Sequence, residues 1–253
     1  MTDSPRFIHL RTHSEYSLLE GAMRLKKLPD LVRGAGMPAI ALTDTNNMFA
    51  ALEFSVGMAG AGIQPIIGCQ VDLQYVTPRP GERPRPPAPV VLLAQSEAGY
   101  ENLMKLKSCL YLREGSELPH VTLEELAAHA RDVICLTGGP EGPVGMLLQS
   151  SQRPAAEALM DNLSAGFGDR LYVELQRHPG EGGAPEAEVL TERGLVEMAY
   201  ARDLPLVATN DVYFPKADMY ESHDALICIA DGAYVDQQEP RRRLTAQHYF
   251  KSQ

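Results

Sequence analysis

Residues 7–14 have the sequence Phe7-Ile8-His9-Leu10-Arg11-Thr12-His13-Ser14, an apolar run that ends abruptly in polar, metal-capable side chains. The same order returns along the chain: an apolar segment, then His, Asp, Asn or Gly, then a segment with helical spacing. We therefore predict a strand at residues 7–10. The other predicted strands are 39–43, 63–73, 90–94, 133–137, 171–175 and 206–209.

Helical spacing and capping residues separate these strands. The predicted helices are 28–35, 48–60, 96–112, a helix capped by Thr122, 153–165, 185–202 and 221–230. Continuously apolar strands that alternate with helices indicate an α/β fold with a parallel sheet. Seven such units favour a (βα)7 barrel, and a doubly wound open sheet is the alternative. The barrel explains better why polar residues follow six of the seven strands, because they would converge on one rim.

The composition is that of a soluble globular protein, with 44% hydrophobic and 22% charged residues among 253. A net charge of −10 argues against a broad nucleic-acid-binding surface, because phosphate binding needs clustered Lys and Arg. The four cysteines are far apart, which predicts free thiols in a reducing compartment. The N-terminus lacks the features of a signal peptide, and no apolar run is long enough for a membrane span. We expect a cytoplasmic protein.

Two segments fall outside the repeating pattern. Residues 77–89 are rich in Pro and Arg and predict an exposed loop or a hairpin tip. Residues 245–253 predict a capped first turn of a helix that stops, so we expect a fragment of a longer protein. The basic run at 241–243 predicts a solvated linker, with a contact to DNA or to a neighbouring domain as the alternative.

The residues at the strand ends include His and Asp, which are suitable ligands for a hydrolytic divalent-metal centre. Two or three metal ions in such a centre would activate water and neutralise a phosphate ester. The candidate positions are Arg11, His13, Asp44, Thr45, Gln70, Gly139, His178, Asp211 and Tyr213.

Five stretches carry a resemblance to a known family: RFIHLRTHSEYSLLEGA, MPAIALTDTNNMFAALEF, AGIQPIIGCQV, LYVELQRH and LPLVATNDVYF. Over its whole length, 1–253, the chain resembles the PHP (polymerase and histidinol phosphatase) domain of bacterial DNA polymerase III alpha subunits of the replicative type. The resemblance implies a distorted (βα)7 barrel. It also implies that residues 240–253 begin the connection to a polymerase region. In this family an intact site binds up to three metals and hydrolyses phosphoesters, in some members as a proofreading exonuclease.

Compared with the family pattern, the metal site of this chain is degenerate. The substituted positions are Arg11 and Thr45 in place of His, Gln70 in place of an acid, Gly139 in place of Cys or His, and Tyr213 in place of His. The matching positions are His13, Asp44, His178 and Asp211. The resemblance therefore implies no catalytic residues in this chain and no metal cofactor, with a residual single divalent metal at the four matching residues left open.

Arg11 suggests what replaced the metal charge. Asp44 and Asp211 would converge on the barrel rim, where two carboxylates in a partly dry pocket repel each other. A guanidinium is always charged and could bridge them. The alternative is an Arg11 side chain that points into solvent.

The resemblance implies a non-catalytic scaffold that packs against the polymerase core of the same chain and docks the proofreading exonuclease (epsilon) subunit of the replisome. The parent chain would be a DNA-directed DNA polymerase, a nucleotidyltransferase that uses Mg²⁺ and contacts DNA mainly through other domains, with no membrane contact. The main competing hypothesis is a metal-dependent phosphoesterase or 3′–5′ exonuclease. A stand-alone relative of histidinol phosphatase and a translesion-type polymerase subunit are further alternatives.

Overall fold

The computed structural model describes residues 7–76, 85–113, 118–180, 183–237, 241–242 and 244–252. The chain forms two compact units. The first unit comprises residues 1–67, 178–183 and 209–253, and the second comprises 68–177 and 184–208. The chain passes from one to the other within strand β2 (Gln64–Gln74).

The first unit is built on strand β1 (Ala39–Leu42), which pairs in parallel with the start of β2. The segment at 9–12 also bonds β1: the amide of Ala41 donates to His9 O at 2.8 Å and that of Thr43 to Thr12 O at 2.9 Å. Thr12 further forms a parallel bridge with Val212. The predicted strand at 7–10 is therefore wrong as a regular strand, because this backbone divides its hydrogen bonds among several segments.

Short helices enclose the core of the first unit. They are a 3-10 turn at Leu25–Lys27, α1 (Leu28–Gly34), α2 (Ala51–Gly60), a second 3-10 turn at Ala217–Met219 and α8 (Tyr220–Asp231). Helix α1 has Pro29 in its first turn, where the missing N–H breaks no helical bond. Helix α2 begins three residues later than predicted, after a stretch of turns. Its Phe54 and Met58 pack with Leu28, Ile40 and Val212 in one apolar cluster.

The C-terminal segment of the first unit has a turn at 246–247 and a bridge at Tyr249, so the helix predicted from 245 onward is wrong. Tyr249 forms a parallel bridge with Phe214, and the amide of Phe250 donates to Phe214 O at 2.9 Å. The segment bonds to a neighbour because its aromatic residue Phe250 is buried in the core cluster. A helix there would have to break these contacts.

Two arginines of the basic run also belong to the folded part of this unit. Arg241 makes two 2.7 Å bonds to the Asp224 carboxylate of α8, and Arg242 bonds to Glu20 at 3.0 Å. The interpretation as a solvated linker is therefore wrong for both. The third arginine lies outside the described residues.

The second unit contains a mixed sheet. The rest of β2 runs antiparallel to β3 (Ala88–Ala94), and β3 runs antiparallel to β5 (Val133–Leu136). Strands β6 (Leu171–Leu175) and β7 (Leu206–Ala208) continue in parallel. A two-residue strand, β4 (Val121–Thr122), pairs with β2.

The prediction of a fully parallel sheet is wrong at β3. A parallel crossover needs a dozen or more residues and usually contains a helix. The sequence between β2 and β3 predicts no helix. Ala88 and Pro89 belong to β3 rather than to the predicted loop, with Pro89 near the start of the strand, where proline is tolerated. Residues 77–84 of that loop lie outside the described residues.

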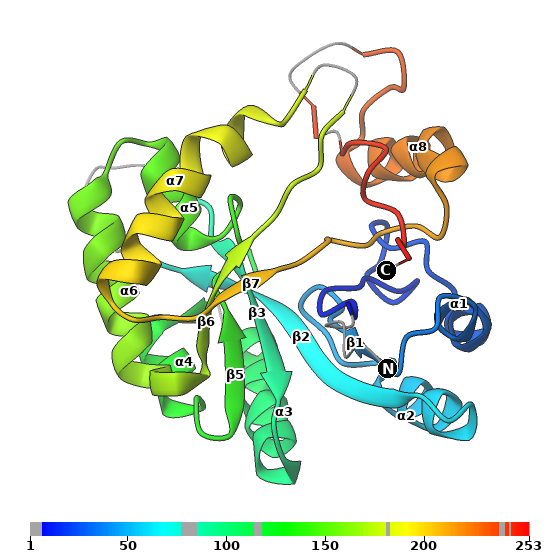
Figure 1. Cartoon of the computed structure of the whole chain (residues 1–253), viewed down its shortest axis with the longest axis horizontal. Coiled ribbons are helices and arrows are strands. Elements are labelled where there is room, and N and C mark those ends of the chain that lie inside the picture. The colour runs from blue at the N-terminus through cyan, green and yellow to red at the C-terminus, as the bar shows by residue number, and fades with distance from the viewer. Residues whose placement is uncertain are drawn as a thin grey trace, which may run out of the picture. The chain divides into compact units, whose positions relative to one another are not determined.

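The helices of the second unit mostly follow the predictions. They are α3 (Glu97–Leu112), α4 (Leu123–Ala128), α5 (Pro143–Gln149), α6 (Arg153–Phe167), a 3-10 turn at Gly168–Arg170 and α7 (Glu186–Ala201). Ser96 caps α3, and Thr122 forms the predicted capping box with Glu125. Helix α5 was not predicted; it packs against α6 and α7, and the three lie together in Figure 1.

Within the described ranges, no helix is both long and apolar enough to cross a membrane.

Candidate functional site

The nine candidate positions are divided between the two units. Arg11, His13, Asp44, Thr45, His178, Asp211 and Tyr213 lie in the first unit, and Gln70 and Gly139 lie in the second.

The first unit holds a buried ion pair at the end of the opening motif. Arg11 is 1% exposed, and its Nε lies 3.1 Å from Asp211 Oδ1. His13 Nε2 lies 2.9 Å from the same oxygen. The backbone brings them together, because Thr12 pairs with Val212 and the amide of His13 donates to Val212 O at 2.8 Å.

The charge of Asp211 is stabilised by its neighbours. Burial alone would raise the pKa of Asp211, but the nearby Arg11 guanidinium and His13 imidazole lower it well below its usual range. The carboxylate is therefore ionised in the folded protein at neutral pH. Pairing with Arg11 confirms one half of the predicted bridge, and the alternative of an Arg11 side chain in solvent is wrong.

Asp44 accepts hydrogen bonds from two serines. Its Oδ1 accepts hydrogen bonds from the amide of Ser14 and the hydroxyl of Ser17, both at 2.7 Å, and its Oδ2 accepts from the Ser14 hydroxyl at 2.8 Å. All three residues are buried. Neither Ser14 nor Ser17 was among the predicted site residues. The available signal was two hydroxyls three residues apart, directly after the opening motif.

Thr45 connects the motif to its surroundings. Its hydroxyl donates to Glu20 Oε2 at 2.7 Å and lies 3.3 Å from Nδ1 of His13. The Ser17 hydroxyl also lies 3.3 Å from that nitrogen. With Nε2 bonded to Asp211, both ring nitrogens of His13 have protein partners.

Aromatic rings enclose the remaining candidate residues. His178 stacks on His248 with ring centroids 3.9 Å apart, and His13 stacks on Tyr213 at 4.3 Å. His178 Nε2 also accepts a 3.4 Å bond from the amide of Asp211. Burial, together with the charge of His178, lowers the pKa of His248 to about 3, so that its ring is neutral at pH 7. His248 was not predicted for the site, because its segment has the sequence pattern of a helix start.

These side chains do not fit a divalent cation. The oxygen Oδ1 of Asp211 already receives Arg11 and His13, and both oxygens of Asp44 accept bonds from serines. A cation near Asp211 would meet the fixed positive charge of Arg11. Across the residues that the structure describes, no group of three or more His, Cys, Asp or Glu side chains is arranged to hold a metal ion.

The two candidate positions in the second unit lie in packed surroundings. Gln70 is buried in β2, opposite Val91. Gly139 has φ of +63°, and a Cβ there would lie 3.1 Å from Cδ of Gln176. A larger residue at 139 would therefore need both a strained backbone and displacement of Gln176.

Gln176 donates a hydrogen bond to the buried carboxylate of Glu174, which was not among the predicted site residues. Its Nε2 donates to Glu174 Oε1 at 3.1 Å, and Glu174 Oε2 accepts from the amide of Gly138 at 2.9 Å. Glu174 is fully buried in β6. These bonds fix the backbone beside Gly139.

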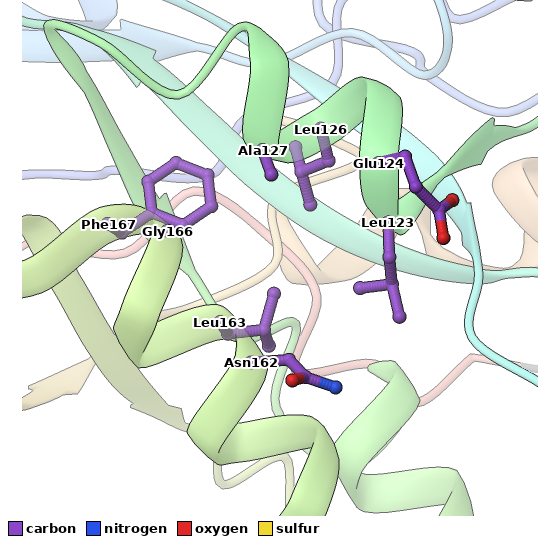
Figure 2. Close-up of a pocket in the computed structure, with 8 residues that line it drawn as sticks. All are labelled: Leu123, Glu124, Leu126, Ala127, Asn162, Leu163, Gly166 and Phe167. Atoms are coloured by element: carbon purple, nitrogen blue, oxygen red, sulfur yellow. The ribbon is translucent and has the colours of Figure 1, made fainter.

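A surface hollow of the second unit lies between α4 and α6. Leucines, Ala127, Gly166 and Phe167 line it, and Figure 2 shows the polar ends of Glu124 and Asn162 at its edges. None of the nine candidate residues is among its lining residues.

Comparisons with known proteins identify relatives over nearly the whole chain. The PHP domain family matches residues 9–178. The DNA polymerase III subunit alpha of Caulobacter vibrioides (strain NA1000 / CB15N) is 47% identical over 247 residues, covering 97% of this chain and 21% of that protein. The same subunit of Rickettsia bellii (strain RML369-C) is 38% identical over 248 residues, covering 97% of this chain and 20% of that protein. The chain thus spans about a fifth of the length of these curated relatives.

A solved structure shares the fold. It is an amidohydrolase from Chromobacterium violaceum with bound sulfate and no metal, 14% identical, with a TM-score of 0.53. The match covers 87% of this chain and 96% of that one. At this identity the likeness concerns the fold alone. With the family match, it confirms the predicted fold class, an α/β fold of the distorted (βα)7 barrel type found in PHP domains.

Proposed function

This chain belongs to the PHP domain family, and from that premise we propose that it is the PHP domain of a replicative DNA polymerase III alpha subunit and acts there as a scaffold without hydrolytic activity. The polymerase context is supported by the 47% and 38% identity to alpha subunits, each covering 97% of this chain.

The observation that carries the proposal is the buried Arg11–Asp211 pair. In a metal-dependent hydrolase the carboxylate would hold a cation that activates water and neutralises the phosphate ester. Here a guanidinium supplies the positive charge, and a guanidinium can neither coordinate water nor lower its pKa. The pair therefore neutralises the buried carboxylate without activating water for hydrolysis.

The scaffold has two proposed contacts in the replisome. It supports the polymerase core of the same longer chain, and it docks the proofreading exonuclease (epsilon) subunit. Nucleotidyl transfer with Mg²⁺ and the main DNA contacts belong to other parts of that chain. The assembly works in the cytoplasm. An external proofreader removes the need for an intact hydrolytic site in this domain, which agrees with the substitutions at Arg11, Thr45, Gln70, Gly139 and Tyr213.

The test is a turnover assay on the purified chain with Mn²⁺ or Zn²⁺ and either an aryl phosphate or a primer with a 3′ mismatch. We expect no metal-dependent turnover and no stoichiometric metal after dialysis. The competing hypothesis, a metal-dependent phosphoesterase or 3′–5′ exonuclease with a residual site, predicts turnover that His178→Ala abolishes. His120→Ala, which alters a histidine of the second unit, is the matched control. Such turnover would overturn the proposal.

The docking part has its own test. A pull-down with the exonuclease subunit is expected to retain the chain in the presence of a chelator as well as in its absence, because no metal shapes the contact surface. Failure to retain it under both conditions would remove the docking role and leave the assignment of an inactive domain standing.

A further inference from the structure

Helix α2 of the first unit is apolar on the side that faces solvent. Its inner face packs Ala51, Phe54 and Met58 into the unit. On the outer face Leu52 is 77% and Val56 65% exposed, and Phe49, one turn before Leu52, is 64% exposed. Leu52 and Val56 are four residues apart within α2 and so lie on one face of the helix, and Phe49 lies in the turn just before the helix begins. A helix that is apolar on all sides is typically buried in a larger structure.

The outer face carries very little charge. Glu53 is the single charged residue between Ala51 and Gly60, and its carboxylate accepts a 3.3 Å bond from the Tyr16 hydroxyl. Two more exposed leucines, Leu18 and Leu19, follow Tyr16, and Leu19 has φ of +62°. A bulky residue in the left-handed region is uncommon and often marks a functional surface.

Neither close packing nor backbone conformation within the described chain requires glycine at two positions of α2. A Cβ at Gly57 or at Gly60 would meet nothing within 4 Å, and neither residue has a positive φ. Glycine inside a helix is less favourable than alanine. Small residues next to the exposed stripe let another backbone approach closely.

We propose that the outer face of α2, defined by Phe49, Leu52, Val56, Gly57 and Gly60, is the surface on which the polymerase portion of the same longer chain packs. This inference rests on the proposed function. The relatives are about five times as long as this chain, so a large partner would be permanently attached to it. A surface with one charge in ten residues suits a permanent cover, because permanent interfaces are more apolar than those of partners that separate.

The test is hydroxyl-radical footprinting of the full-length subunit alone. We expect Phe49, Leu52 and Val56 to be protected from labelling. Val189 of α7, which is 65% exposed like Val56, and its neighbour Leu190 should be labelled in the same sample. Labelling of the α2 face in the full-length subunit would overturn the proposal. So would protection that appears only when the exonuclease subunit is added, or only at high protein concentration, because these identify a separate protein or a second copy as the occupant.

A pair of charge substitutions makes the test independent of labelling chemistry. Val56→Arg is expected to lower the melting temperature of the full-length subunit and to expose Leu52 to labelling. Val189→Arg, with the same starting exposure, should do neither. An unchanged melting temperature and footprint in Val56→Arg would overturn the proposal.

Glycine substitutions probe the close approach separately. Gly57→Ala should lower the melting temperature of the full-length subunit, and Gly34→Ala at the end of α1, which also has open space around it, should not. An equal effect of the two substitutions would contradict a close backbone contact at Gly57. Failure of these tests leaves the turnover assay unaffected, so the inference and the proposed function can fail separately.

Discussion

The interiors of the two units differ in kind. Among its described residues, the first unit buries the Arg11–Asp211 ion pair, several histidines and three carboxylates, those of Asp44, Asp211 and Asp224. The second unit buries mainly aliphatic side chains from its strands and helices. The candidate positions differ in the same way: Arg11 pairs with a buried carboxylate in the first unit, while Gly139 of the second unit packs against Gln176. A buried carboxylate needs such a partner because an unpaired charge is costly to bury.

The largest effect is expected from removing the cation in the first unit. Arg11→Met keeps most of the side-chain length but removes the guanidinium that pairs with the buried Asp211 carboxylate. Breaking a buried pair in this way typically lowers the free energy of unfolding by roughly 3–5 kcal/mol. Denaturant unfolding at pH 7 measures the change.

The control is an exposed pair of the second unit. Arg177 lies 2.6 Å from Glu192, a shorter contact than that of Arg11, but its side chain is 76% exposed. Arg177→Met should change stability little, because solvent screens surface pairs. Equal losses from the two substitutions would mean that burial does not distinguish the units.

Acid sensitivity is the next expected difference. Burial lowers the pKa of His9 from 6.5 to about 4, aided by the Lys251 ammonium, while a bond to Lys251 O opposes the shift. The unfolded chain therefore binds a proton between pH 6.5 and about 4 that the folded chain does not. Stability falls as pH drops through this window, by roughly 3 kcal/mol for His9.

The variant His9→Phe should have a flatter dependence of unfolding free energy on pH between 6.5 and 4. The remaining slope includes His248. Phe7→Leu alters the packing against the His9 ring without removing a titrating group, so it should lower stability equally across the range. An unchanged slope in His9→Phe would show that its burial does not contribute to acid sensitivity.

Much of the fold follows from local sequence. Apart from the segment at 7–10, the predicted apolar strands lie close to their predicted positions, as do the helix starts at Ser96 and Thr122, and all of these are local features. The antiparallel β3 and the C-terminal segment at 244–252 depend on partners far away in sequence, such as Phe214 for Tyr249. Local patterns contain no information about such partners.

The candidate site shows the same limit. The Arg11–Asp211 pairing followed from charge and strand position, because two buried acids need a cation. The serine partners of Asp44 and the stacking of His248 on His178 depend on side-chain placement that spacing does not determine. The assignment of His13, Asp44, His178 and Asp211 as former ligands stays a prediction.

A smaller effect is expected at the packed position of the second unit. Gly139→Ala places a Cβ on a backbone with φ of +63°, which costs roughly 1–2 kcal/mol, and presses it against Gln176. Gly36→Ala, with φ of +69° and nothing within 4 Å, isolates the backbone contribution. Gly139→Ala should lower the free energy of unfolding more than Gly36→Ala does, and by the same amount at every pH. The effect of Gly139→Ala should be smaller in a protein that also carries Gln176→Ala. A loss that matched Gly36→Ala would mean that Gln176 moves aside freely.

We propose that the Arg11 guanidinium supplies at Asp211 the positive charge that a metal ion would otherwise supply. A double-mutant cycle with Arg11→Met and Asp211→Asn, followed by denaturant unfolding at pH 7, measures this pairing. We expect a coupling of roughly 2–3 kcal/mol, with the double variant more stable than the sum of the single losses implies. A coupling below about 0.5 kcal/mol, the level at which independent sites add, would contradict it.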